Sequence, residues 1–145
     1  MRKRDKWTEF ELYSFQREFT SDEIWELGKD SIINKNGRLE GIYKIINKQS
    51  EKCYIGASQN IMSRMKGHIS NLKLGKHSIF EMQQDYNKYG IISFRFIIIL
   101  FCSHSELSKY EKEKLEEHKN RLYNVDELNG WYSGISKINR RSLDR

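Results

Sequence analysis

GIYKIINKQSEKCYIG, the stretch Gly41–Gly56, carries a Gly-Ile-Tyr cluster at one end and a Tyr-Ile-Gly cluster at the other. The β-branched and aromatic residues of each cluster favour a strand, and the polar residues between them favour a turn. If Tyr43 pairs directly with Tyr54, the loop is Asn47–Ser50, which is a common hairpin length. Side chains at such facing positions share one face of the sheet, with Cβ atoms about 5 Å apart. The stretch therefore predicts an antiparallel hairpin that brings two phenol groups together.

Hydrophobic spacing beyond this hairpin predicts a small α/β domain with a largely antiparallel sheet. Apolar residues recur at helical intervals, and Gly75 and Gly90 are placed to end two helices. A later run of β-branched and aromatic residues predicts a strand covered on both faces. Ser103-x-x-Glu106 is a capping-box pattern that opens a further helix. The expected elements are strands over 41–47 and 51–57, helices from Ser58 or Asn60 to Gly75 and from Ser78 to Gly90, a strand over 94–101 and a helix over about 104–119.

The N-terminal segment is expected to be an extension outside this core. Ser21 is a candidate N-cap for a helix that runs to about Asn34. The residues expected to face inward from this helix are Ile24, Leu27 and Ile32. The expected organisation is an N-terminal helical extension over 1–38, a core over 39–125 and a basic C-terminal tail over 126–145.

Composition indicates a globular protein of one domain. The chain has 145 residues, of which 37% are apolar and 32% charged, unlike a disordered protein. No apolar run is long enough to span a bilayer, and no apolar stretch follows the basic N-terminus as it would in a signal peptide. Cys53 and Cys102 lack the spacing of a zinc site or a disulfide framework. These features predict a cytoplasmic protein without a membrane partner.

The net charge of +6 is concentrated in the segment that contains both tyrosine clusters. Residues 41–90 carry eight Lys or Arg against three Asp or Glu, whereas residues 1–40 carry eight against nine. A basic segment around a candidate site favours a polyanionic partner. A solvated basic face without a partner explains the same charge equally well.

Two polar residues border the apolar stripe of the first expected core helix. Arg64 and His68 are four residues apart, so they share one face of that helix. An arginine just after a strand-to-helix turn could hold a phosphate with its planar guanidinium group. Alternatively, its stem packs against the core while its charged end stays in water.

An acidic residue interrupts the apolar stripe of the last expected helix. Glu111 lies four residues after Leu107 and four before Leu115, whereas Glu113 falls on another face. An inward-facing carboxylate is costly unless it is paired or binds a cation, and a divalent ion prefers such an oxygen ligand. A salt bridge, or a helix phase that exposes Glu111, would explain the pattern without a metal.

These residues form an ordered series that resembles the GIY-YIG nuclease family. The similarity covers residues 40–125, and it is greatest to the catalytic domains of homing endonucleases of phages and introns. Restriction enzymes and repair incision nucleases share the same core. One short motif would mean little, but an ordered series with compatible spacing is specific. The matched residues are Gly41-Ile42-Tyr43, Tyr54-Ile55-Gly56, Arg64, His68, His77, the run from Asn87 to Gly90, Glu111 and Asn124.

The resemblance implies a three-stranded antiparallel sheet flanked by helices and the hydrolysis of phosphodiester bonds in DNA. It further implies one divalent cation, Mg²⁺ or Mn²⁺, with Glu111 as its protein ligand. Arg64 would stabilise phosphate charge, and both tyrosines would lie at the scissile phosphate. Tyr43 would be the general base, and His68 would receive its proton. The residues implied to bind substrate or support the site are Gly41, Gly56, His77 and Asn124.

Other functions remain open at this point. A catalytically weak DNA-binding module would use the same basic face, although the complete set of tyrosines, arginine and glutamate argues against it. A structural or partner-binding domain would keep the tyrosines as core residues. Within the nuclease interpretation, homing, restriction, repair and interference with competing DNA are not separated by the sequence.

Overall fold

A computed structural model describes residues 17–27 and 39–132 of the protein. Within these ranges the three strands form one antiparallel sheet in the order β2-β1-β3, which confirms the expected α+β fold. None of the helices in the same ranges is long and apolar enough to cross a membrane. The main elements are α2 (Ser21–Leu27), β1 (Gly41–Asn47), β2 (Cys53–Ser58), α4 (Ile61–Lys73), α5 (Phe80–Tyr89), β3 (Phe94–Phe101), α6 (Leu107–Glu117) and α7 (Val125–Tyr132).

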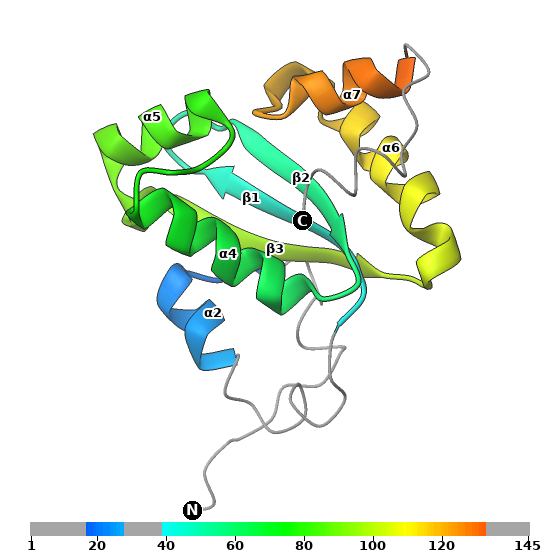
Figure 1. Ribbon diagram of the computed structural model, residues 1–145, viewed down its shortest axis with the longest axis horizontal. Coiled ribbons are helices and arrows are strands. Elements are labelled where there is room, and N and C mark those ends of the chain that lie inside the picture. The colour runs from blue at the N-terminus through cyan, green and yellow to red at the C-terminus, as the bar shows by residue number, and fades with distance from the viewer. Residues whose placement is uncertain (1–16, 28–38, 133–145) are drawn as a thin grey trace, which may run out of the picture.

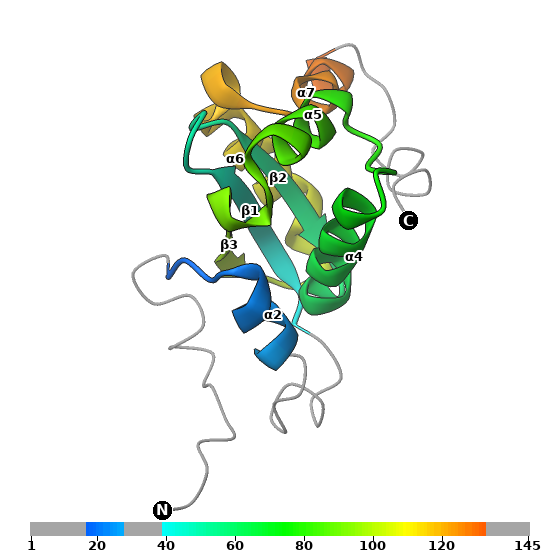
Figure 2. The same ribbon diagram turned by 90° about the vertical axis from the view of Figure 1, so that its left-hand side faces the viewer.

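Helices cover both faces of the sheet (Figure 1). Side chains alternate along a strand, so Tyr43 and Ile45 of β1 lie in one apolar cluster while Ile42 lies in the other. Helices α2, α4 and α5 contribute to the cluster of Tyr43, and α6 and α7 contribute to the cluster of Ile42. Figure 2 shows the sheet between α4 and α6. The predicted site residues therefore come from different layers: Tyr43 and Tyr54 face α4, and Glu111 belongs to α6.

The hairpin forms, but the direct pairing of the two tyrosines is wrong. Tyr43 pairs with Gly56, and Tyr54 pairs with Ile45. The partner of Tyr43 is thus displaced by two residues from the expected one. A displacement of two preserves the alternation of side chains, so both tyrosines still lie on the same face of the sheet.

The loop of the hairpin explains this register. The Asn47 N–H donates to the Lys52 carbonyl at 2.9 Å, which moves the loop to residues 48–51. The Asn47 side chain accepts the N–H of Gln49, also at 2.9 Å, and so stabilises the turn locally. Glu51 closes the loop with a φ of 65°, a left-handed conformation that the sequence did not indicate because glycine is usual there.

The start of α4 and the ends of both α4 and α5 follow the capping signals. The Asn60 side chain accepts the Ser63 N–H at 3.1 Å and caps α4. Gly75 and Gly90 lie after the two helices with φ values of 74° and 80°, which favour glycine. The start of α5 was expected at Ser78, but the helix begins at Phe80.

The last strand and the helix after it also match the expectation. Strand β3 is buried along its middle, as the run of β-branched and aromatic residues predicts. Ser103 and Glu106 form the expected capping box. The first turn beyond Ser103 is a 3-10 turn at His104–Glu106, so the α-helix begins at Leu107 and ends two residues before the expected end.

The N-terminal helix packs on the core, and its cap differs from the expected one. Thr20, not Ser21, caps α2, because the Glu23 N–H donates to the Thr20 hydroxyl while the Thr20 N–H donates to the Glu23 carboxylate. Ile24 and Leu27 are buried, as expected, whereas Ile32 lies outside the described residues. Phe19, just before the helix, pairs with Phe96 on the outer side of β3.

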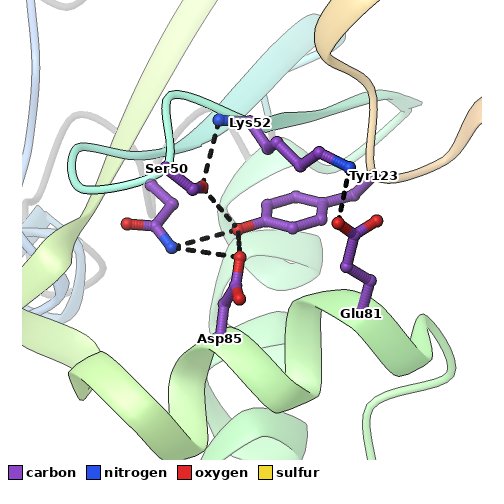
Figure 3. A network of polar contacts seen from close by, with 6 residues as sticks. Ser50, Lys52, Glu81, Asp85 and Tyr123 are labelled. Atoms are coloured by element: carbon purple, nitrogen blue, oxygen red, sulfur yellow. Dashed lines mark hydrogen bonds and ion pairs between the residues drawn. The ribbon is translucent and has the colours of Figure 1, made fainter.

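A group of polar side chains joins the hairpin loop, α5 and the segment before α7 (Figure 3). Tyr123 donates its hydroxyl hydrogen to Asp85 of α5 and accepts from the Asn47 amide at 3.1 Å. Ser50 in the loop lies 3.3 Å from the same hydroxyl. Burial and the Asp85 carboxylate raise the pKa of Tyr123, so it stays protonated and acts as a donor. This group holds three distant segments at one end of the sheet.

Two glycines of the motifs are required by close packing. A Cβ at Gly56 would lie 2.4 Å from Cζ of Tyr43, so the tyrosine ring fits only because the residue opposite it has no side chain. A Cβ at Gly41 would lie 2.0 Å from the Leu100 carbonyl oxygen on β3. Gly67, within α4, has nothing within 4 Å of such a Cβ.

Alanine substitutions at these glycines should therefore have opposite effects on stability. Gly56→Ala should destabilise the protein by about 1–3 kcal/mol, because the added methyl group displaces the Tyr43 ring. Gly67→Ala should stabilise it by about 0.5–1 kcal/mol, because alanine loses less backbone entropy in a helix. Urea unfolding of both variants and the wild type measures the difference. Equal stability of the two variants would contradict the tight contact at Gly56.

Candidate active site

The two motif tyrosines lie together beneath α4. Tyr43 comes from the central strand and Tyr54 from its neighbour, with ring centroids 6.0 Å apart. Their exposed fractions are 0% and 2%. The expectation that the hairpin brings the phenols to one place is confirmed, although both rings are part of the first apolar cluster.

Two histidines complete a cluster of four rings. His68 of α4 packs edge-on to Tyr54 at 4.6 Å between centroids, and His77 stacks on His68 at 5.0 Å. The Tyr43 hydroxyl lies 2.9 Å from Nε2 of His68, and Nδ1 of His68 lies 2.8 Å from Nε2 of His77. The structure thus connects three of the predicted site residues by direct hydrogen bonds.

Both histidines are held in their neutral form. Burial, the neighbouring His77 and the Arg64 charge place the pKa of His68 well below its usual value. Burial and the Arg64 charge lower the pKa of His77 to about 4. At neutral pH each ring therefore carries one N–H and one bare nitrogen.

Arg64 lies one helical turn before His68 and belongs to the same site. Its charge acts on both histidines, and its side chain is half-buried. It is the most exposed of the residues predicted to be catalytic, since Tyr43, Tyr54 and His68 are buried.

Glu111 has the predicted helix phase. Its exposed fraction is 3%, and it lies on the buried stripe of α6 between Leu107 and Leu115, whereas Glu113 is exposed. Helix α6 packs mainly on β2, from the side opposite to α4. The glutamate and the ring cluster therefore lie on opposite faces of the sheet. Strand β2 lies at one edge of the sheet, so its outer side is open to pairing by another segment of the chain.

Asn124 is attached to that edge. Its side-chain amide donates to the Ile55 carbonyl at 2.7 Å, and its side-chain oxygen accepts the Ile55 N–H at 3.3 Å. Just before it, the Tyr123 N–H bonds the Cys53 carbonyl, so this segment pairs with β2. Asn124 thus fixes the backbone of Ile55, the middle residue of the Tyr-Ile-Gly motif.

Gln83 supports the site and was missed by the sequence analysis. It is buried, its side-chain oxygen accepts the His77 N–H at 2.9 Å, and its amide donates to the Leu72 carbonyl at 3.0 Å. The signal was present, because Gln83 follows Ile79 by four residues and so lies on the inner stripe of α5. A polar residue on such a stripe is the pattern that drew attention to Glu111.

A metal ion would have few protein ligands here. Among residues 17–27 and 39–132, no group of three or more His, Cys, Asp or Glu side chains could hold one. Glu111 supplies a buried carboxylate of the type that hard divalent cations prefer. The donor chemistry fits an ion that takes most of its ligands from water and substrate.

Comparison with known proteins assigns this arrangement to a family. The family model "GIY-YIG catalytic domain" matches residues 39–124. The chain belongs to the GIY-YIG family. Members of this family are generally dependent on a divalent metal. The matched range begins just before β1 and ends at Asn124, so it contains the whole sheet, the ring cluster and Glu111.

The GIY-YIG domain is similar to those of phage homing enzymes. The chain is 33% identical over 96 residues to "Intron-associated endonuclease 1" of Enterobacteria phage T4, which covers 66% of this chain and 36% of that protein. Two structures of the catalytic domain of intron endonuclease I-TevI also match, at 27% and 28% identity and TM-scores of 0.55 and 0.54. They cover 60% and 59% of this chain and 93% and 97% of those domains. The chain therefore spans about a third of the length of the phage protein and nearly all of its catalytic domain.

The neutral histidines should make stability pH-dependent. The unfolded chain binds protons at His68 and His77 below about pH 6.5, whereas the folded chain does not, so stability is lost as the pH falls toward 4. We expect a loss of about 3 kcal/mol over this interval from His77, whose pKa falls from 6.5 to about 4, and a further loss from His68. Replacing both histidines by glutamine should flatten the curve, and His104→Gln should leave it unchanged. Urea unfolding at a series of pH values measures it, and identical slopes in all three proteins would refute the assignment.

Proposed function

We propose that the chain is a divalent-metal-dependent DNA endonuclease of the phage homing type. The observation that carries the proposal is the hydrogen-bonded cluster of Tyr43, His68 and His77 with Arg64 at its exposed side. The net positive charge of residues 41–90 suits a phosphate polymer as substrate. The similarity to a phage intron-associated endonuclease supports DNA as that polymer.

Each proposed role follows from the position of its residue. Arg64 is half-buried and would hold phosphate oxygens with its guanidinium group. Tyr43 would act as general base, taking a proton from the water whose oxygen attacks phosphorus, while the bond to the leaving oxygen breaks and that oxygen takes a proton from solvent. Since Tyr43 has no exposed surface, this water must enter the site to reach it. Tyr54 packs against the His68 ring and would complete the wall of the phosphate site.

Glu111 would hold the metal, with Mg²⁺ or Mn²⁺ as the proposed ion. A bound cation would supply Lewis-acid stabilisation of negative charge on the phosphate. The protein would present this carboxylate from the buried stripe of α6, the helix that packs on β2. The apolar residues on each side of Glu111 fix its direction.

The first test compares two glutamates on the same helix. Plasmid DNA incubated with the full chain should be nicked or cut in Mg²⁺ and left intact in EDTA. Glu111→Gln should remove detectable cleavage, because a neutral amide is a poor ligand for a hard cation, while Glu113→Gln on the exposed face should cleave like the wild type. Gel retention of DNA should be similar in all three proteins. Cleavage in EDTA, or loss of activity in Glu113→Gln alone, would contradict the proposal, and retention without cleavage by the wild type would identify a binding module.

Arg64→Lys should separate charge from geometry. Lysine keeps the charge but presents a point ammonium group instead of a planar fork. Losing one well-placed charged hydrogen bond costs about 1.5–3 kcal/mol, so single-turnover cleavage should fall by roughly 10- to 100-fold. DNA affinity at fixed salt should change far less. Arg121→Lys, at an exposed position, is the matched control, and a rate for Arg64→Lys within about twofold of wild type would exclude the proposed role.

A further inference from the structure

A chain of three hydrogen bonds ends at the Tyr43 hydroxyl. The backbone N–H of Ile79 donates to Nδ1 of His77 at 3.0 Å. Nε2 of His77 lies 2.8 Å from Nδ1 of His68, and Nε2 of His68 lies 2.9 Å from the Tyr43 oxygen. His68 is 6% and His77 9% exposed, so water does not compete freely for these nitrogens.

The direction of this chain is fixed at its first member. A backbone N–H can only donate, so Nδ1 of His77 must be bare. Both histidines are neutral at neutral pH, because burial and the Arg64 charge lower the pKa of each. Neutral His77 therefore carries its hydrogen on Nε2 and donates to His68. By the same reasoning, His68 carries its hydrogen on Nε2 and donates to Tyr43.

We propose that the Ile79 backbone N–H sets a one-way chain in which His68 donates to Tyr43, and that His77 is a positioning residue which acts on Tyr43 through His68. The proposal rests on the proposed function, since it states how the base of that reaction is held. It places the ring hydrogen of both histidines on Nε2, and it makes the backbone N–H of Ile79 the group that determines this placement.

This direction is the reverse of a proton transfer from Tyr43 to His68. For that transfer, Nε2 of His68 would have to be bare and its hydrogen would have to lie on Nδ1. His77 would then have to accept at Nε2 while it also accepts from Ile79 at Nδ1, and a ring with two bare nitrogens is an imidazolate anion. Such an anion is not formed near neutral pH. The proton that Tyr43 takes from water therefore stays on the tyrosine until it is released to solvent.

A donor at this place suits a tyrosine that must become negatively charged. A hydrogen bond to the charged form of a group favours that form, so His68 would stabilise the Tyr43 phenolate while keeping its own hydrogen. The hydrogen bond also limits the orientation of the Tyr43 hydroxyl. His68 and His77 thus take no part in moving protons during the reaction.

The loop that carries Ile79 is held in place by its own contacts. Gln83 accepts the His77 N–H, donates to the Leu72 carbonyl at the end of α4 and donates to Asn87 within α5. Ile79 caps α5 in an extended conformation, which directs its N–H back toward the preceding His77 ring. Because Ile79 directly precedes α5, its N–H has no partner within the helix and is available to the His77 ring.

The first experiment reads the tautomers directly. Long-range ¹H–¹⁵N NMR spectra of the ¹⁵N-labelled full chain near neutral pH distinguish a hydrogen on Nε2 from one on Nδ1, with signals assigned from His68→Gln and His77→Gln. We expect both rings to be neutral with the hydrogen on Nε2. In His77→Phe, His68 should lose this single state and populate both tautomers, whereas His104→Phe should not change it. A hydrogen on Nδ1 of His68 in the wild type would overturn the proposal.

The second experiment separates donation from proton acceptance. Glutamine at position 68 places an amide N–H near the position of Nε2 but cannot take up a proton, and alanine can do neither. Single-turnover cleavage by His68→Gln should be about 10- to 100-fold faster than by His68→Ala, because the Gln variant keeps a hydrogen bond to the charged oxygen. Equal rates in two folded variants would show that His68 must accept the proton.

The two results are independent of one another. Thermal unfolding of each variant identifies one that fails to fold, and in that case the wild-type NMR spectrum decides alone. If the wild type does not cleave DNA under any divalent-metal condition, the proposed function fails. The tautomer measurement still accepts or rejects the chain of hydrogen bonds in that event.

Discussion

The contact on which the structure depends is the passage of the Tyr43 ring across the backbone of Gly56. This register of β1 against β2 is possible only with glycine at position 56, since any side chain there would occupy the space of the ring. It also places the phenol oxygen at His68, so the register that the loop produces also brings about the first hydrogen bond of the site. The two halves of the sequence motif are therefore one packing unit, and glycine is required in it for its missing Cβ and not for an unusual backbone angle.

The order of strands and helices could be predicted from the sequence because each element carries its own signal. Asn60, Gly75 and Gly90 mark helix ends through local chemistry, and the phase of Glu111 follows from its spacing to two leucines. The register of the hairpin could not, because it depends on a left-handed Glu51 that residue preferences do not favour. Helix ends and the hairpin turn are both local features. The prediction was therefore correct where the preference of a residue agreed with the backbone conformation that it adopts, as at Gly75 and Gly90, and wrong where it did not, as at Glu51.

The candidate site shows a second kind of limit. The resemblance to the GIY-YIG family identified Tyr43, His68 and His77, since their side chains belong to the matched series of residues. The residue type of Ile79 does not indicate a role in the site, because Ile79 contributes its backbone N–H to the His77 ring and not its side chain. Likewise, the role of Asn124 follows from its two hydrogen bonds to the Ile55 backbone, which depend on how the chain returns to β2 after α6. Tertiary contacts of this type become visible only when the fold is known.

A three-stranded sheet has two outer strands, and both are partly paired by segments from elsewhere in the chain. Phe19 forms two backbone hydrogen bonds with Phe96 on β3, and Leu122 lies along Cys53 on β2. Unpaired strand edges are templates for sheet growth between molecules, so these two short pairings reduce the length of edge through which two molecules could pair. Phe19, which pairs with β3, precedes the range of residues 39–124 that the family model matches. The segment at residues 17–27 thus covers, from outside the range that the family model matches, part of an edge through which the sheet could pair with another molecule.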